Sequence, residues 1–242
     1  MKVEEYSNRF AKEILQHHEH AEAWNEIYGV IKNTPLFIYP GKSTSNSRLD
    51  VVQQVMNAYY DRRLAVDLGW EYHPLATTIA NSGLAADFRK QFGNVVVQVE
   101  VQFGNMSRWY SDIFKFQTAY SQRLINIGIC ILPTNMIANR IDSNVANYER
   151  AIREIPSAEL SITLPILLAG LTADENTPIV DISQTQFDGL KSINGKGNVN
   201  NRWRIVNGYL NQVEMSEIGP NSPVGPILDP VILAAIAAGG ED

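Results

Sequence analysis

Two carboxylates and one amide, those of Asp87, Glu100 and Gln102, are the side chains whose types and spacing could do chemistry. Magnesium is a hard cation that takes oxygen ligands, usually one or two carboxylates completed by waters and phosphate oxygens. Hydrolysis of a phosphodiester at neutral pH needs such an ion, an activated water and neutralisation of the developing negative charge. An aspartate and a glutamate this far apart also occur by chance in most proteins, so a solvated strand face is the competing interpretation.

Residues 95–103 (VVVQVEVQF) form the clearest predicted strand, and its alternation sets which side chains can meet. Successive side chains of a strand point to opposite faces, which puts Gln98, Glu100 and Gln102 on one face and valines on the other. Three polar groups on one face of an apolar strand require partners, because burying them unpaired is costly. If Asp87 begins an antiparallel neighbour of this strand, the Asp87 and Glu100 carboxylates can meet.

The chain as a whole reads as strands separated by helices, which indicates an α/β sheet. Apolar residues at helical spacing predict two helices over 4–33, one from Asp50 to near Gly69, a long one over 109–124 and a short one over 144–154. Two further apolar runs, 127–132 and 164–171, predict core strands. Residues 40–50 and 134–142 read as polar loops, and 71–94 as irregular structure.

The net charge of −6 and the pI near 5.3 count against a nucleic-acid-binding protein, because such proteins usually carry a basic field. The objection is limited, since a cleft can be locally basic on an acidic protein and a phosphodiesterase must concentrate carboxylates to hold its metal. The 242 residues, of which 45% are apolar, suffice for one large α/β domain or for one domain with an added subdomain.

The single cysteine, Cys130, lies in the apolar run 127–132, so we expect a buried thiol and no internal disulfide. This usage indicates a reducing, cytosolic setting. The N-terminal residues lack the apolar core of a signal peptide, and no apolar stretch reaches the ~18 residues of a transmembrane helix. We therefore expect no association with a membrane.

Residues 99–105 (VEVQFGN) resemble the active-site strand of the BglII/BstYI family of type II restriction endonucleases. This family carries E-x-Q where most relatives in the PD-(D/E)XK nuclease superfamily carry E-x-K, and Asp87-Phe88 resembles its upstream D-F pair. The resemblance extends in order and spacing over roughly residues 3–172, and the first two of the following segments resemble the family's N-terminal helices. The segments are 3–10 (VEEYSNRF), 24–27 (WNEI), 68–70 (LGW), 131–133 (ILP) and 147–149 (NYE). The segment between Asp87 and Glu100 is longer than in the relatives.

The resemblance implies a Mg²⁺-dependent enzyme that cuts double-stranded DNA at a short palindrome, for which a sequence containing GATC is the first candidate. It implies a central mixed β-sheet flanked by helices, which we divide into a catalytic core over 1–172 and a C-terminal extension over 173–242 that contacts DNA or a second subunit. Asp87, Glu100 and the Val101 carbonyl would bind the metal, and Gln102 would orient the attacking water. Glutamine is neither a cation nor a strong base, so the metal must carry more of the water activation and charge neutralisation.

Reading a base edge requires side chains with paired donors and acceptors, and amides suit adenine. The resemblance points to two loops for this task. The candidates are Asn105, directly after the catalytic strand, and Ser143 and Asn144, with Arg140 and Asp142 alongside. Ordinary loop residues and helix caps are the alternatives, and Ser143 could cap the helix that follows it.

A further loop and one histidine are weaker candidates for DNA contact. Lys42, Ser43 and Arg48 lie in the polar loop 40–50 and could fix the enzyme on the DNA backbone, although an ordinary surface loop is an equal alternative. His73 lies in a region that the relatives place near the cleaved strand. A structural histidine is the favoured interpretation there.

Two clusters fall outside this scheme. His17, His18 and His20 suggest zinc, but they have no cysteine and no suitable fourth ligand nearby, so a solvated turn between helices is favoured. The best local basic cluster comprises Lys191, Lys196, Arg202 and Arg204, with Trp203 among them. It lies outside the resemblance, and either an added DNA contact or a dimer element would account for it.

The expected partners follow from the expected reaction. A two-fold enzyme presents each loop twice and so matches a two-fold DNA site, which predicts a homodimer. A cognate DNA methyltransferase is implied functionally, without a stable complex, and the resemblance implies a prokaryotic cytoplasmic setting. Two other functions remain open: a catalytically inactive DNA-binding module and a repair nuclease on the same fold. The intact set of Asp87, Glu100 and Gln102 favours activity over the inactive module.

Overall fold

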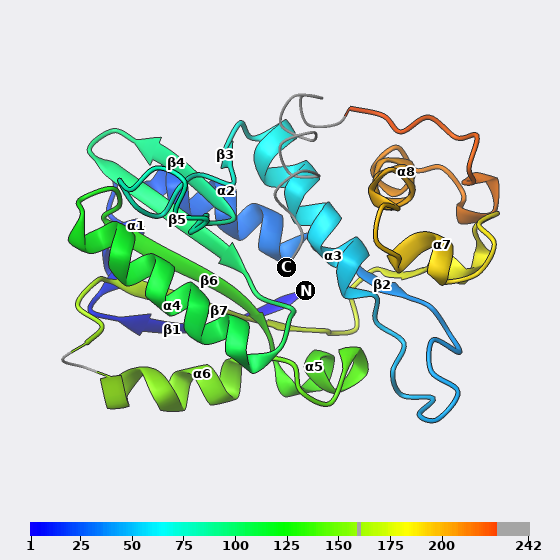
Figure 1. Cartoon of the computed structure of the whole chain (residues 1–242), viewed down its shortest axis with the longest axis horizontal. Helices are drawn as coiled ribbons and strands as arrows, with labels where there is room; N and C mark the ends of the chain where they lie inside the picture. The colour runs from blue at the N-terminus through cyan, green and yellow to red at the C-terminus, as the bar shows by residue number, and fades with distance from the viewer. Residues whose placement is uncertain (159–160, 227–242) are drawn as a thin grey trace. The chain divides into compact units, whose positions relative to one another are not determined.

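The computed structural model describes residues 1–158 and 161–226, which form two compact units. The first unit lies within residues 1–34 and 69–178, and the second comprises residues 35–68 and 179–226 (Figure 1). This division differs from the boundary near 172 that the sequence suggested. Residues 35–68 join the later residues because strand β2 (Leu36–Ile38) pairs in parallel with β8 (Ile179–Asp181).

A six-stranded sheet forms the centre of the first unit. In spatial order its strands are β1 (Lys2–Asn8), β7 (Ile166–Thr172), β6 (Ile127–Pro133), β5 (Val95–Val101), β4 (Phe88–Phe92) and β3 (Glu71–Tyr72). The pairs β5–β6 and β6–β7 are parallel, and the other three pairs are antiparallel. The expected fold class, a mixed sheet flanked by helices, is confirmed.

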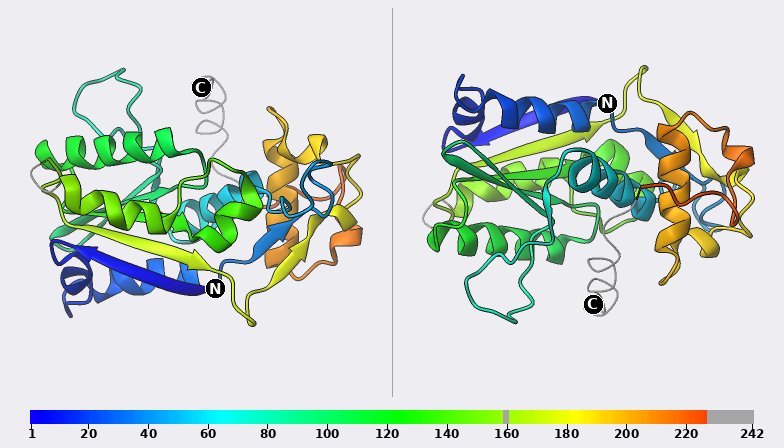
Figure 2. Two further views of the ribbon diagram at one scale, coloured as in Figure 1. Left: turned by 90° about the horizontal axis from the view of Figure 1, so that it is seen from below. Right: turned by 90° about the horizontal axis from the view of Figure 1, so that it is seen from above.

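Helices cover both faces of this sheet (Figure 2). On one face lie α1 (Ala11–Leu15) and α2 (Ala21–Lys32), and on the other lie α4 (Met106–Ser121) and α6 (Tyr148–Glu154). Two glycines allow the second layer to approach closely. A Cβ atom on Gly128 of β6 would lie 2.7 Å from the Phe116 ring, and one on Gly170 of β7 would lie 2.6 Å from the Tyr148 ring. The face that α4 packs against also carries the chemistry described below.

The second unit is built around helix α3 (Gln53–Tyr60), which continues as a π-helix over Asp61–Asp67 and packs against α8 (Val199–Leu210). Its other elements are α7 (Lys191–Asn194) and the 3₁₀ turns Ile182–Gln184 and Met215–Glu217. The aromatic rings of Phe37, Tyr59 and Tyr209 meet in its interior. The last residues of the predicted C-terminal extension, 227–242, lie outside the described part of the chain.

Three local predictions were wrong. Residues 2–8 form edge strand β1 rather than part of a helix, because their polar side chains, typical of an edge strand, obscure the two-residue period. Residues 135–141 form helix α5 (Asn135–Ile141) rather than a loop, with Ile137, Ala138 and Ile141 buried at helical spacing. The segment 71–94 contains β3 and β4. Within the described residues, no helix is long and apolar enough to cross a membrane.

Candidate active site

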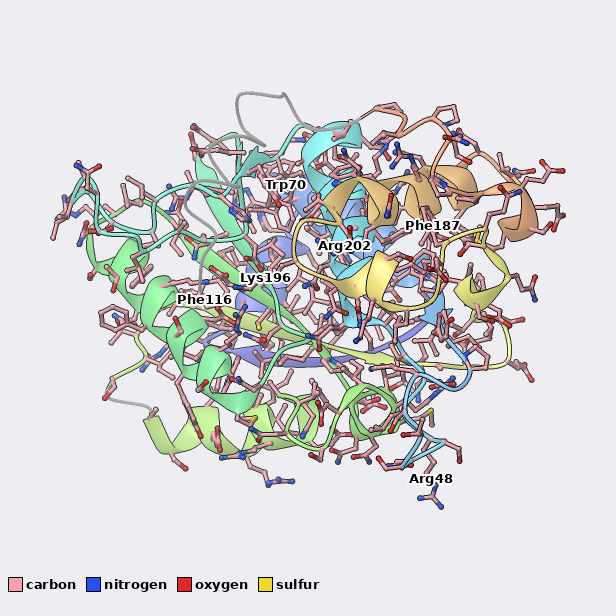
Figure 3. The ribbon with its side chains drawn as sticks, turned by 45° about the vertical axis from the view of Figure 1, so that its right-hand side comes forward. Arg48, Trp70, Phe116, Phe187, Lys196 and Arg202 are labelled. Atoms are coloured by element: carbon pink, nitrogen blue, oxygen red, sulfur yellow. The ribbon has the colours of Figure 1, made fainter. Side chains whose placement is uncertain are left out.

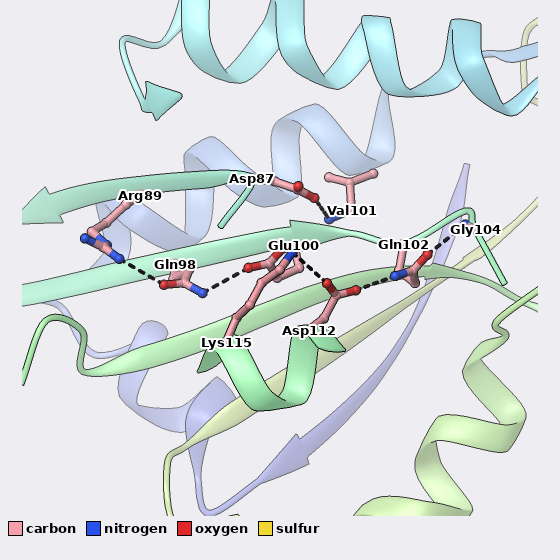
Figure 4. A network of polar contacts seen from close by, with 9 residues as sticks. All are labelled: Asp87, Arg89, Gln98, Glu100, Val101, Gln102, Gly104, Asp112 and Lys115. Atoms are coloured by element: carbon pink, nitrogen blue, oxygen red, sulfur yellow. Dashed lines mark hydrogen bonds and ion pairs between the residues drawn. The ribbon is translucent and has the colours of Figure 1, made fainter. Parts of the chain in front are cut away.

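Strands β4 and β5 form a hairpin whose register sets Asp87 across from Glu100. Phe88 pairs with Val99 in the antiparallel ladder, so the residue before Phe88 lies opposite the residue after Val99. The Val101 N–H donates to Asp87 Oδ2 at 2.7 Å and holds this carboxylate beside β5 (Figure 4). The antiparallel neighbour predicted for the catalytic strand is therefore present, and the long segment between the two carboxylates is accommodated by the hairpin.

The polar row of β5 is buried, not solvated. Gln98 and Glu100 are 0% exposed and Gln102 is 4% exposed. In the parallel ladder with β6, Gln98 is level with Gly128 and Glu100 with Cys130, and α4 packs on this face. The alternative of a solvated strand face was therefore wrong.

Both carboxylate oxygens of Glu100 accept hydrogen bonds from neighbouring side chains. Gln98 Nε2 donates to Oε1 at 3.0 Å, and Lys115 Nζ donates to Oε2 at 3.1 Å. The Arg89 guanidinium in turn donates to Gln98 Oε1 at 3.2 Å. Figure 4 shows this chain of contacts running along the face of the hairpin. Glu100 is thus fixed in one orientation although no water reaches it.

The amide of Gln102 is also fixed at both ends. The Gly104 N–H donates to Gln102 Oε1 at 2.7 Å, and Gln102 Nε2 donates to the Asp112 carboxylate. A carboxylate only accepts and a main-chain N–H only donates, so the two ends of the amide cannot be exchanged. An amide has two N–H groups and two lone pairs, which leaves one of each for a further ligand such as water.

Asp112 and Lys115 belong to the site although sequence analysis did not identify them. They lie three residues apart on α4 and therefore on the same side of the helix. Lys115 Nζ contacts Asp112 Oδ1 at 3.0 Å, and Asp112 is 4% exposed. A signal existed, because a buried helix face that contains an aspartate and a lysine needs a polar surface opposite. The polar row of β5 is that surface.

The carboxylates of the site repel one another in a setting that water does not screen. Burial raises the pKa of Glu100 well above its ordinary value, the Asp87 and Asp112 carboxylates add to the effect, and Lys115 opposes it. Burial raises the pKa of Asp112 to about 6, against the opposing effect of Lys115. Burial alone would lower the pKa of Lys115, but the three carboxylates outweigh it and the pKa is raised. Such an excess of buried negative charge suits a divalent cation.

Comparisons with known proteins place this arrangement in a family. A sequence profile of the restriction endonuclease BglII/BglIII family matches residues 3–171. The chain belongs to this family. A crystal structure of restriction endonuclease BglII with a DNA 16-mer is similar, with TM-score 0.61 and 22% identity over 73% of this chain and 81% of that one. Free BglII is similar with TM-score 0.52 and 23% identity over 73% and 82% of the two chains. A search of curated proteins found no match.

Membership of the BglII/BglIII family confirms the expected enzyme class, a type II restriction endonuclease that cuts DNA. The matched residues contain every element of the site: the hairpin, β6 and α4. The two BglII structures share their fold with 73% of this chain. The roles of the individual residues come from the geometry of this chain.

His73 lies beside Asp87 in this endonuclease. Its main-chain N–H donates to the Asp87 carbonyl at 3.0 Å, and its backbone has a φ of 50°, a left-handed conformation that is uncommon outside glycine. Its ring stacks on Tyr72 with centroids 4.0 Å apart. Desolvation lowers the pKa of His73, and the Asp87 carboxylate opposes that shift. The histidine therefore lies at the edge of the carboxylate cluster.

The two candidate base-reading loops of this endonuclease lie side by side. Asn105 forms an isolated antiparallel bridge with Val145, and the Ala146 N–H donates to the Gly104 carbonyl at 2.9 Å. Asn105 caps α4, because its Oδ1 accepts from the N–H groups of Ser107 and Arg108. Asn105 is therefore a helix cap, the role that the sequence offered as the alternative to base reading.

The other candidate base-reading residues lie in the second of these loops and in the helix before it. Asn144 lies on an exposed turn next to the bridge, together with Ser143 and Asp142. Asp142 Oδ1 accepts from the Ser143 N–H at 2.6 Å, so this pair supports the turn locally. Arg140 lies in the last turn of α5. Asn144 is thus the amide that the turn presents to solvent beside the catalytic strand.

The other predicted phosphate-contacting residues lie in the second unit. Lys42 Nζ donates to the Val51 carbonyl at 2.6 Å, and Ser43 Oγ accepts from the Asn46 N–H, so both support their own loop. Arg48 extends from this loop into solvent (Figure 3).

The predicted basic cluster is partly structural. Arg202 donates to the carbonyls of Ile193 and Gly195, Arg204 donates to the Ser222 carbonyl, and Trp203 is buried. Lys191 and Lys196 are exposed, the first on α7 and the second on the turn that follows it. The arginines thus hold the second unit together.

The histidines between α1 and α2 lie on a turn, as expected. His17 and Glu19 are exposed and His20 is half-buried, and one ligand atom of each lies within 4.8 Å of the others. The His18 and His17 rings lie with centroids 4.2 Å apart and are tilted by 44°. This cluster is remote in sequence from the catalytic hairpin.

Proposed function

We propose that this chain is a homodimeric, Mg²⁺-dependent endonuclease that hydrolyses both strands of DNA at a short palindrome, for which a GATC-containing sequence is the first candidate. The observation that carries the proposal is the register of the β4–β5 hairpin, which sets Asp87 opposite Glu100 with Gln102 on the same face. Family membership supplies the substrate class, because the similar BglII structure contains a DNA 16-mer.

The residues present fit a hard divalent ion. Asp87 and Glu100 offer carboxylate oxygens, the Val101 main chain lies beside Asp87, and the mutual repulsion of the buried carboxylates would be relieved by a cation. The proposed ligands, Asp87, Glu100 and the Val101 main chain, are all oxygen ligands, which favours Mg²⁺ over zinc. When bound, the ion would polarise the phosphate and lower the pKa of a coordinated water.

The protein side chains then have separate tasks. Asp87 and Glu100 would hold the ion, and Glu100 keeps one orientation because Gln98 and Lys115 each donate to one of its oxygens. Gln102 presents one free N–H and one lone pair in a fixed direction, which suits it to orient a water and not to remove its proton. The proton of the attacking water would therefore go to an acceptor other than Gln102.

The test is incubation of the protein with a mixed-sequence plasmid and Mg²⁺, followed by sequencing of the ends. Discrete fragments that share one palindromic end sequence support the proposal. A smear indicates an unspecific nuclease, such as a repair enzyme. Retained DNA binding without cutting indicates an inactive DNA-binding module. The host would need a methyltransferase that modifies the same sequence, and we place the pair in the prokaryotic cytoplasm, where DNA is the shared substrate.

Cleavage is expected to require Mg²⁺ or Mn²⁺ and to stop when the ions are chelated. Ca²⁺ should support DNA binding without cutting, because it takes more ligands at longer, more flexible distances and polarises water less. The measurement is plasmid cleavage and DNA binding in parallel across the three ions. Cutting that survives exhaustive chelation would rule out the mechanism.

We further propose that the second copy of the chain docks on α4. Tyr110 and Phe114, 50% and 62% exposed, form an apolar surface on the outer side of this helix, opposite the buried Trp109 and Phe116. The Tyr110 hydroxyl accepts a hydrogen bond from Arg150 and donates one to Glu154, so side chains of α6 border this surface. Two copies that share this surface would present two active sites to the two strands of a palindrome.

Light scattering at micromolar concentration should give twice the chain mass of 27.0 kDa, and Phe114→Asp should reduce it towards one chain. A charge at the centre of an apolar interface is costly to desolvate. The matched control is Phe10→Asp, because Phe10 is 73% exposed just before α1, on the face of the sheet opposite α4, and should not affect the mass. A wild-type monomer, or a Phe114→Asp protein that stays dimeric, would contradict this interface.

A further inference from the structure

The catalytic strand of this enzyme carries Gln102 where most relatives in the superfamily carry a lysine, yet a lysine ammonium is present in the site. We propose that Lys115, delivered from helix α4, is the cationic group of the catalytic centre and stabilises the negative charge that develops on the phosphate during cleavage. The inference deepens the proposed function and rests on it. It assigns to a helix residue the task that the strand residue cannot perform.

The position of Lys115 is fixed by one carboxylate on β5 and one on α4. Its Nζ lies 3.1 Å from Glu100 Oε2 and 3.0 Å from Asp112 Oδ1, and its side chain is 17% exposed. Asp112 also accepts from Gln102 Nε2. One carboxylate therefore positions both the ammonium and the amide (Figure 4). Phe116 of the same helix packs on Gly128 of β6, the strand next to β5.

The chemistry of the ammonium suits this task. Lys115 forms ion pairs with two carboxylates, Glu100 at 3.1 Å and Asp112 at 3.0 Å, an arrangement that favours the ammonium form. An ammonium has three N–H donors, and Glu100 and Asp112 take two of them. The third donor is left for a phosphate oxygen or for the attacking water. A preorganised positive charge in a site that excludes water stabilises developing charge more strongly than it would in solvent.

A simpler alternative is that Lys115 is only a counter-ion for the buried carboxylates and is redundant once a metal binds. The two roles predict opposite results at saturating metal. A counter-ion becomes dispensable when the metal is bound, whereas a catalytic cation is still required. The comparison of Lys115→Met with wild type at saturating Mg²⁺ therefore separates them.

Under single-turnover conditions with saturating DNA and Mg²⁺, Lys115→Met should cut about 100-fold or more slowly than wild type, the loss typical of one preorganised charge-stabilising donor. Lys115→Arg should restore part of the rate. The matched control is Lys90→Met, because Lys90 is another partly buried lysine, paired with Glu26 at 2.8 Å outside the site, and should leave the rate unchanged. Lys115→Met cutting as fast as wild type would overturn the inference.

A readout besides cleavage guards against a purely structural effect. Mn²⁺ binding to the free protein, followed by calorimetry, should be as tight in Lys115→Met as in wild type or tighter, because a neighbouring positive charge is gone. DNA binding in Ca²⁺ should be retained. Loss of Mn²⁺ binding in parallel with the loss of cutting would overturn the inference, since Lys115 would then serve to assemble the metal site. A wild-type protein that binds Mn²⁺ and DNA without cutting would overturn both the inference and the proposed function.

Chemical rescue provides the decisive experiment. Lys115→Cys, alkylated with 2-bromoethylamine, regains an ammonium on a side chain of nearly native length. The only native cysteine, Cys130, is fully buried, and burial raises its thiol pKa well above the ordinary value, so it should not react in the folded protein. Alkylation should raise the cutting rate of the variant at least tenfold towards wild type and leave reagent-treated wild type unchanged. An alkylated variant that folds, binds Mn²⁺ and stays as slow as the untreated one would refute the role of Lys115.

Discussion

Asp87→Ala is expected to abolish cleavage while DNA binding is retained. The Asp87 carboxylate is held next to β5 by the Val101 N–H and lies opposite Glu100, so its loss removes half of the carboxylate pair that would hold the ion. The cleavage rate should fall by about 10³-fold or more, the upper end of what a single electrostatic group contributes to a transition state. Without metal, DNA should bind equally well or more tightly, because one source of repulsion towards phosphate is gone.

Glu100→Gln should have an effect of the same order. The amide has nearly the shape of the carboxylate, so the fold should survive although the residue is 0% exposed. The matched control is Glu26→Gln, because Glu26 is a carboxylate of the same unit that accepts from Trp70 and Lys90 away from the site. Single-turnover cleavage and DNA binding in Ca²⁺ are measured on all three variants. Near wild-type cutting by Asp87→Ala or Glu100→Gln would exclude that residue from the site.

The strand that carries the site could be predicted because its signal is local. Alternation over 95–103 gave the faces of Glu100 and Gln102 directly, and a hairpin is the shortest way to bring Asp87 to the same face. Burial of the polar row could not be predicted, because it depends on which helix covers it. Asp112 and Lys115 became identifiable only once α4 lay over β5, since on the sequence they look like an ordinary helical charge pair.

The parts that could not be predicted depend on pairing between distant residues. Strand β1 is stabilised by its antiparallel register with β7, more than 150 residues away, and its own polar sequence gives no periodic signal. The second unit depends on two three-residue strands, β2 and β8, that are far apart in the sequence. Segments this short carry too few side chains for a period to be recognised.

Asn105 and Asn144, the two amides expected to read bases, differ in whether they also have a structural role. Asn105 was expected to read a base, and its Oδ1 also caps α4. A bidentate contact with adenine needs both the oxygen and the NH₂ group of an amide, and the cap already uses the oxygen. Asn144 is exposed on the adjacent turn, and within the described residues its side chain caps no helix. We therefore expect Asn144 to contribute more to base discrimination than Asn105.

Asn144→Ala is expected to lower cleavage of the preferred sequence strongly while leaving stability and non-specific DNA affinity nearly unchanged. One amide-to-adenine contact contributes roughly 1–3 kcal/mol of discrimination, and a dimer makes it twice, so the specific rate should fall by about 30-fold to 10⁴-fold. Affinity for random DNA depends mainly on phosphate contacts, which this substitution does not touch. The measurement is competition between specific and random duplexes across a salt series.

Variants of Asn105 and Arg48 are the controls for the competition assay on Asn144→Ala. Asn105→Ala should lower the stability of α4 by about 0.5–2 kcal/mol, whereas Asn105→Ser keeps a capping oxygen and should not. A loss of discrimination in the stable Asn105→Ser variant would show that the Asn105 amide also reads a base. Arg48→Ala removes an exposed cation, so it should weaken binding to both duplexes alike and reduce the salt slope by about one. If Asn144→Ala instead weakens both duplexes equally, Asn144 positions the DNA backbone and the sequence must be read elsewhere on the chain.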